Sequence, residues 1–130
     1  MIKGAFEMGY SLKGTASAAI AACLMLSGVA YGATAPENYR FYCAQCHGLE
    51  GRGDGPNATK SQPVSPRDHT SVLEMNKLTD DDVLNAITDG GAAVSKSTMM
   101  PPFGKTLSKG EISALKDYIR TLCKCKGKGR

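Results

Sequence analysis

The sequence predicts an all-α domain. Two segments, 79–90 and 107–123, place apolar residues at the three- and four-residue spacing of an amphipathic helix. No segment alternates apolar with polar residues in the way that a half-exposed strand would. The 130 residues suffice for one domain with a thin core, and they include no tryptophan and few aromatic residues. A core of this kind is typically completed by a staple or by a large apolar cofactor.

The first 32 residues have the pattern of a secretory signal peptide. Lys3 and Lys13 precede an uncharged apolar run, and small residues follow at Ala30 and Gly32. We therefore expect export to the periplasm, with cleavage after Gly32. One alternative is an uncleaved membrane anchor, because the run is close to the length that spans a bilayer. Another is lipidation at Cys23, which ends a lipoprotein-like segment.

The expected domain covers residues 33–122. Its first helix starts near Pro36 and runs to Cys43, because proline suits a first helical turn and Glu37 complements the positive end of the helix dipole. Residues 48–66 are rich in Gly, Pro and Ser and predict an ordered loop, since long loops in small domains usually serve a site. A short helical turn is expected at 71–76.

Start and stop signals bound the two longer helices. Thr79 caps the first, three aspartates fill its first turn, and Gly90 ends it. Ser108 and Glu111 form a capping box at the start of the last helix. The apolar stripe of that last helix consists of Ile112, Leu115, Ile119 and Leu122. A second loop, rich in methionine and proline, connects the two.

The segment CAQCH brings two thiols and an imidazole together. Cys43 and Cys46 are about one helical turn apart, and His47 follows Cys43 by four residues, so all three share one face. C-x-x-C-H is the attachment pattern of c-type haem, in which the thiols add to the vinyl groups as thioethers and the histidine Nε2 binds iron. We therefore expect one haem c, held covalently through Cys43 and Cys46.

Three other interpretations of this segment are weaker. A zinc site needs four ligands, and the other cysteine pair, Cys123 and Cys125, has a different spacing in a basic tail. A thioredoxin-like dithiol belongs to a βαβ context that the sequence lacks. A structural disulfide would not need His47.

Met100 is the candidate for the second axial ligand. It directly precedes two prolines, which hold the preceding residue extended and stiffen the loop. Thioether sulfur is soft and favours ferrous iron, which raises the reduction potential. The alternatives are that Met100 fills a gap in the core, or that Met99, Met75 or His69 is the ligand. His69 follows a polar stretch and is expected to be solvated.

These motifs together resemble a class I cytochrome c of the bacterial single-haem type. The resemblance rests on CAQCHG followed by GRGDGP, on MPPFGKTLS and on EISALKDYIRTL, and it covers about residues 36–122. It implies three to five short helices wrapped around one haem, with the first and last helices crossing. Tyr39, Leu115 and Tyr118 would form the crossing contact, and Ala35 stands near the place where the family often has glycine.

The same resemblance implies a role for Pro56. Its carbonyl would accept the Nδ1 proton of His47, which would orient the ring and strengthen its donation to iron. Arg67 is a candidate to face a haem propionate on the basis of its charge alone, and a solvated side chain is the alternative.

The expected function is electron transfer and not catalysis, because an iron with both axial positions filled has no place for a substrate. The partners would be redox proteins in small, transient, charge-steered encounters, and nothing indicates nucleic acid. One alternative is a haem enzyme or gas-binding protein in which Met100 is displaced. Another is a cytochrome subunit of a larger respiratory complex.

Residues 123–130, CKCKGKGR, form a basic tail that is expected to be disordered. A disulfide between Cys123 and Cys125 would close a very small ring. Pairing of either cysteine with another chain and metal capture are equally open. The oligomeric state is therefore not decided by the sequence.

Overall fold

The computed structural model describes residues 32–129, and over this range every regular element is helical. This confirms the all-α prediction. The predicted signal peptide lies outside the described residues, apart from Gly32. Within the described range, no helix has both the length and the apolar character needed to cross a bilayer.

Three helical elements follow one another without a break at the start of the domain. They are α2 (Ala35–Asn38), the π-helical segment η2 (Tyr39–Cys43) and α3 (Ala44–His47). The Glu37 carboxylate accepts a hydrogen bond from the Thr34 N–H over 2.7 Å, which fixes the helix start. The helical backbone therefore continues four residues beyond the predicted end at Cys43 and carries the whole CAQCH segment.

The remaining elements lie close to the predicted positions. They are α4 (Val72–Met75), α5 (Asp80–Asp89), the short 3-10 helix η3 (Ala92–Val94) and α6 (Lys109–Cys123). The Thr79 hydroxyl accepts from the Asp82 N–H over 3.1 Å, and the Ser108 hydroxyl accepts from the Glu111 N–H over 3.3 Å. Both predicted caps are confirmed.

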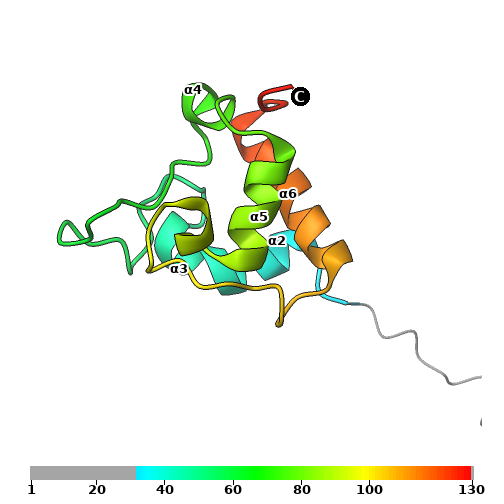
Figure 1. Cartoon of the computed structure of the whole chain (residues 1–130), viewed down its shortest axis with the longest axis horizontal. Helices are drawn as coiled ribbons and strands as arrows, with labels where there is room; N and C mark the ends of the chain where they lie inside the picture. The colour runs from blue at the N-terminus through cyan, green and yellow to red at the C-terminus, as the bar shows by residue number, and fades with distance from the viewer. Residues whose placement is uncertain (1–31, 130) are drawn as a thin grey trace, which may run out of the picture. The chain divides into compact units, whose positions relative to one another are not determined.

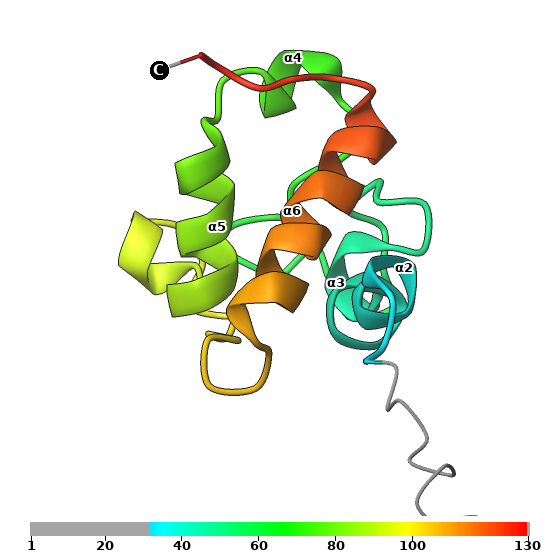
Figure 2. The ribbon, with the colours of Figure 1, turned by 90° about the vertical axis from the view of Figure 1, so that its right-hand side faces the viewer.

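Helix α6 is the central element of the domain. It contacts α2, α4 and α5, and it lies between α5 and α2 in Figure 2. The loop after α3 extends away from these helices to one side (Figure 1). The buried core comprises Tyr39, Ala44, Met75, Val83, Ile87, Leu107, Ile112, Leu115, Ile119 and Cys123.

The expected crossing contact between the first and last helices is present. The rings of Tyr39 and Tyr118 meet edge to face, with centroids 5.2 Å apart. Tyr39 and Leu115 are both fully buried in the same core. The N-terminal helical segment is thereby fixed against α6, which positions the CAQCH segment relative to the rest of the fold.

The C-terminal tail differs from the prediction. Helix α6 includes Cys123, and the following residues turn back and pack against the segment after α4. The Lys128 N–H donates to the Leu78 carbonyl over 2.8 Å, and the Gly127 N–H donates to Asn76 Oδ1 over 3.2 Å. The prediction of a disordered tail is therefore wrong for residues 123–128, because backbone groups of the tail find partners about 50 residues away in the chain.

Candidate functional site

A cavity of about 300 Å³ lies among the helices and loops of the domain. This volume is at the lower end of the range for ligand pockets. Its wall combines residues of the CAQCH segment, the loop after it, α4, α5 and the methionine loop. The lining includes every cysteine, histidine and methionine considered as a haem-binding residue, namely Cys43, Cys46, His47, His69, Met75, Met99 and Met100.

Cys43 and Cys46 are both free and partly buried at this cavity. Burial raises the pKa of the Cys43 thiol to about 12, and the neighbouring Cys46 adds to the effect. Neutral sulfur is therefore favoured over thiolate at Cys43. This environment suits a sulfur that becomes an uncharged thioether.

His47 has the tautomer and charge that a metal ligand needs. Its Nδ1 lies 3.0 Å from the Arg67 carbonyl, which can only accept, so Nδ1 carries the proton and Nε2 has a free lone pair. Burial lowers the pKa of His47, although the hydrogen bond to Arg67 opposes the shift. The imidazole is therefore neutral, and its ring is held by a backbone group.

The predicted role of Pro56 is wrong, because the Arg67 carbonyl takes the single Nδ1 proton of His47. The loop before Pro56 folds onto the end of α3, where the Gly53 and Gly55 N–H groups donate to the carbonyls of His47 and Cys46. This path leaves Pro56 exposed at the surface beside Arg40, outside the main cavity.

The prediction that His69 is solvated is also wrong. Only 8% of this residue is exposed, and its Nδ1 shares a hydrogen bond with the Tyr39 hydroxyl over 3.0 Å. Its ring stacks on that of His47, with centroids 4.2 Å apart and planes 15° apart. Burial lowers the pKa of His69 well below its usual value, so the ring is neutral.

The stacked arrangement bears on which residue can be the second axial ligand. Two axial ligands must approach a metal from opposite sides, each end-on. Stacked rings with centroids 4.2 Å apart leave no room for a metal ion between two end-on nitrogens, so His69 does not oppose His47 across one iron in this arrangement. No local sequence signal indicated that Tyr39 would hold His69 in a buried position, since Tyr39 lies 30 residues before His69 in the chain.

Met100 is partly buried, lines the cavity and packs against the core. Its carbonyl accepts from the Gly91 N–H over 3.0 Å, just after the end of α5. Gly90 and Gly91 lie so close to the methionine loop that a Cβ on Gly91 would come within 3.1 Å of the Met100 Cβ. The loop is therefore fastened to α5. Met99 is 60% exposed, whereas Met75 is fully buried in the cavity wall.

Arg67 also lines the cavity, but its guanidinium has a protein partner. Nη1 lies 3.1 Å from the Glu74 carboxylate in α4. The sequence did not indicate the role of the Arg67 main-chain carbonyl, which accepts the hydrogen bond from His47 Nδ1.

Comparison with known proteins gives one family and a set of structural neighbours. The sequence model of the family described as cytochrome c oxidase, cbb3-type, subunit III, matches residues 32–119. A search of curated proteins gave no match. The solved structure of a c-type cytochrome, KustC0563, superposes with a TM-score of 0.56 at 22% identity, covering 69% of this chain and 98% of that one. This second likeness concerns the fold alone.

A further solved structure is the reducing HAO-like protein complex Kustc0457/Kustc0458 of Kuenenia stuttgartiensis. One of its chains superposes with a TM-score of 0.56 at 34% identity. The match covers 68% of the present protein's chain but only 41% of the neighbour's chain.

Proposed function

This chain belongs to the c-type cytochrome family described as cytochrome c oxidase, cbb3-type, subunit III, and from that premise we propose that it is a periplasmic carrier with one haem c ligated by His47 and Met100. Membership of the family implies covalently bound haem c and a role in electron transfer. One observation carries the finer proposal, namely that a single cavity is lined by Cys43, Cys46, His47 and Met100.

The residues present fit the group. Cys43 and Cys46 would hold it through thioethers, and the neutral sulfur favoured at Cys43 agrees with this linkage. His47 would supply Nε2, with Nδ1 engaged by the Arg67 carbonyl. When bound, the haem supplies one-electron chemistry whose potential depends on its axial ligands and surroundings.

Met100 is proposed as the second axial ligand because its backbone is fixed at its carbonyl and by the residues that follow it. The Gly91 N–H binds its carbonyl, and two prolines follow it directly. The neighbouring Met99 is mostly exposed, and Met75, the last residue of α4, is fully buried in the core. With His47 and Met100 both bound to iron, no coordination site stays open for a substrate, which favours a carrier over an enzyme.

A cytochrome subunit of a larger redox complex is the second candidate. It is favoured by the similarity to one chain of a multi-protein complex and by the printed description of the family, which names an oxidase subunit. Both candidates use the same site and differ in whether the partner is permanent. The mass of the native particle, measured in extracts made without detergent and with detergent, separates them.

Residues 1–32 are proposed as the signal peptide that directs the chain to the periplasm. The support is the basic start, the apolar run and the small residues before Ala33.

The experiment that tests the ligand assignment compares wild type with Met100→Ala and Met99→Ala, each made in cells that attach haem. We expect Met100→Ala to lose the far-red sulfur-to-iron band and to bind carbon monoxide in the reduced state. Met99→Ala is the matched control and should behave as wild type. Retention of the band in Met100→Ala would remove this residue from the proposal, and ready carbon monoxide binding by wild type would favour the gas-binding or enzymatic alternative.

A further inference from the structure

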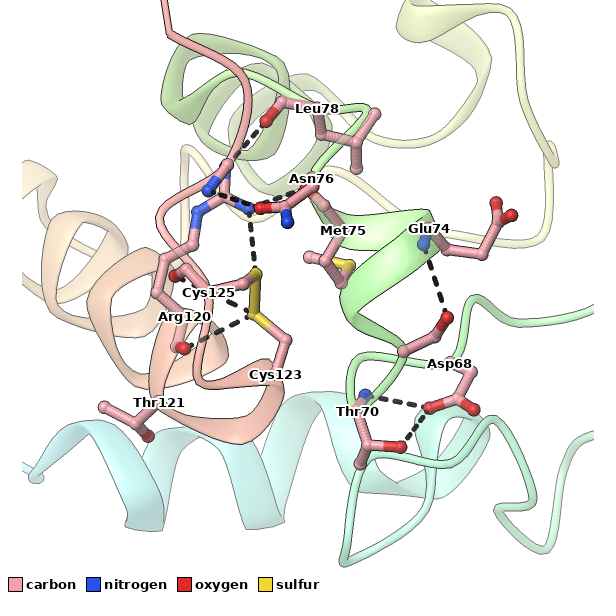
Figure 3. Close-up of a disulfide and its surroundings, with 12 residues drawn as sticks. Asp68, Thr70, Glu74, Met75, Asn76, Leu78, Arg120, Thr121, Cys123 and Cys125 are labelled. Atoms are coloured by element: carbon pink, nitrogen blue, oxygen red, sulfur yellow. Dashed lines mark hydrogen bonds between the residues drawn. A yellow bond between two sulfur atoms is a disulfide. The ribbon is translucent and has the colours of Figure 1, made fainter.

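The C-terminal tail carries a second pair of cysteines, which the structure joins to each other. Helix α6 ends at Cys123, Lys124 adopts the left-handed conformation with φ of 50°, and Cys125 closes a disulfide back to Cys123 (Figure 3). Few non-glycine residues adopt a positive φ. Here the disulfide spans Lys124, and the Cys125 N–H donates to the Arg120 carbonyl over 3.3 Å.

The disulfide stands beside contacts that hold the segment after α4. Arg120 donates from Nη1 to the Met75 carbonyl and from Nη2 to the Leu78 carbonyl, each over 2.9 Å (Figure 3). The tail then crosses this guanidinium so closely that a Cβ on Gly127 would lie 2.3 Å from Nη2. Lys128 completes the contact by donating to Leu78.

Residues 75–78 are part of the wall of the candidate haem cavity, because Met75 and Leu78 both line that cavity. We call residues 123–128 the clasp. The Leu78 carbonyl accepts from both Arg120 and the clasp residue Lys128, and the Gly127 N–H of the clasp donates to the Asn76 side chain. The disulfide therefore closes the start of a segment that contacts one wall of the cavity.

The surroundings of the two sulfurs suit exchange with thiols. Cys123 is 2% exposed, whereas Cys125 is only partly buried and is the sulfur that an incoming thiolate can reach. Arg120 Nη1 lies 3.9 Å from Cys125 Sγ, and Lys124 and Lys126 flank this residue. Nearby positive charge favours the thiolate forms that carry out exchange.

The buried sulfur also has a partner in the reduced state. Cys123 Sγ lies 3.3 Å from the Arg120 carbonyl, which can accept a hydrogen bond from a thiol S–H, whereas a disulfide sulfur has no hydrogen to donate. Opening the bond therefore leaves neither sulfur without a favourable neighbour, since the guanidinium faces Cys125 and the carbonyl faces Cys123.

We propose that Cys123 and Cys125 form a thiol–disulfide exchange site whose opening releases the clasp from residues 75–78. An external dithiol attacks Cys125, forms a mixed disulfide there and displaces Cys123 as a thiolate, which takes a proton. The second thiol of the reductant then attacks the mixed disulfide and releases Cys125 as a thiol. The reductant becomes a disulfide, and two electrons and two protons pass to the pair. This proposal does not depend on the haem ligands.

The test uses the full chain with haem attached, without denaturant. Dithiothreitol is the probe, and maleimide labelling is followed by mass in the peptide 117–130, which contains Cys123 and Cys125 but none of the other cysteines. We expect two labels after reduction and none before it, with the haem spectrum retained. A monothiol, 2-mercaptoethanol, should give one adduct, on Cys125.

Hydrogen exchange then tests the connection to the cavity wall. We expect the amides of residues 72–78 and 125–128 to exchange faster after reduction, while the α5 amides stay unchanged. The double variant Cys123→Ser/Cys125→Ser should match reduced wild type and take up no label in that peptide.

Four results would each overturn the proposal. They are free thiols before reduction, a disulfide that opens only when the chain is unfolded, an adduct on Cys123 in place of Cys125, and unchanged exchange at residues 72–78 in the reduced protein. None of these depends on whether haem is bound, so this inference and the proposed function fail separately.

Discussion

The imidazole rings of His47 and His69 lie stacked, with centroids 4.2 Å apart and planes 15° apart. The Tyr39 hydroxyl shares a hydrogen bond with His69 Nδ1, and the Arg67 carbonyl accepts one from His47 Nδ1. The ring that we propose as an iron ligand is therefore fixed both across its face and at its Nδ1. Groups of this kind orient a ligand and set how strongly it donates.

The hydrogen bond between Tyr39 and His69 predicts a loss of stability in Tyr39→Phe. This change keeps the ring against Tyr118 but leaves the buried His69 Nδ1 without its partner. We expect the free energy of unfolding to fall by about 1–2 kcal/mol, as for the loss of one buried hydrogen bond. Denaturant titration of the haem-loaded protein measures it.

Tyr118→Phe is the matched control for this change. It stands in the same aromatic contact, and its hydroxyl has no hydrogen-bond partner within residues 32–129. Equal losses in the two variants would mean that the Tyr39 hydroxyl has no special role.

A second prediction concerns Gly53, whose backbone lies against Pro66 and Arg67, and the Arg67 carbonyl is the group that accepts from His47 Nδ1. The φ of Gly53 is 77°, and a Cβ there would come within 2.5 Å of the Pro66 carbonyl, next to Arg67. Gly53→Ala should therefore cost about 1–2 kcal/mol for the left-handed backbone alone. It should also displace the Arg67 carbonyl, weaken donation by His47 and raise the reduction potential.

Gly110→Ala provides the comparison for this prediction. This glycine stands in the first turn of α6, and the nearest atom to an added Cβ is Ser108 Oγ at 4.0 Å. We expect a gain of about 0.5–1 kcal/mol and an unchanged potential. Denaturant titration and potentiometry measure both variants, and a potential that moved equally in the two would contradict the argument.

The local features of this fold followed from sequence because neighbouring residues determine them. Thr79 and Ser108 cap their helices with groups three residues away, and CAQCH lies on helical backbone. The π-helical turn that precedes Ala44 has no such local signal. Tertiary contacts decided the features that were missed.

Pro56 and His69 show the limit most clearly. The loop after α3 returns onto the carbonyls of that helix, which sends Pro56 outward and leaves the His47 proton to a residue 20 positions away. His69 is buried because Tyr39, in another element, provides a polar partner. Likewise, the tail is ordered because its N–H groups donate to the Arg120 and Leu78 carbonyls. None of these partners is adjacent in sequence.

The ion pair between Asp80 and Arg120 predicts a small pH effect on stability. The hydrogen bond from Arg120 lowers the pKa of Asp80, so the folded state binds fewer protons than the unfolded state in the acid range. The contribution is complete above the ordinary carboxyl pKa and is lost as the pH falls through the lowered value. Because the Asp80 side chain is 48% exposed, we expect less than about 1 kcal/mol.

The measurement for this ion pair compares wild type with Asp80→Asn by denaturant titration. The difference in unfolding free energy should be present at pH 7, shrink in high salt and disappear in acid, where the carboxyl is protonated in both states. A difference that stayed constant from pH 7 to strong acid would show that the charge of Asp80 is not its cause.

The intact mass of the chain, purified from cells that attach haem, tests the central claim most directly. The account predicts a red protein that starts at Ala33 and carries the mass of one haem, with the linkage lost in Cys43→Ser/Cys46→Ser. A colourless product with the mass of the bare polypeptide would contradict it.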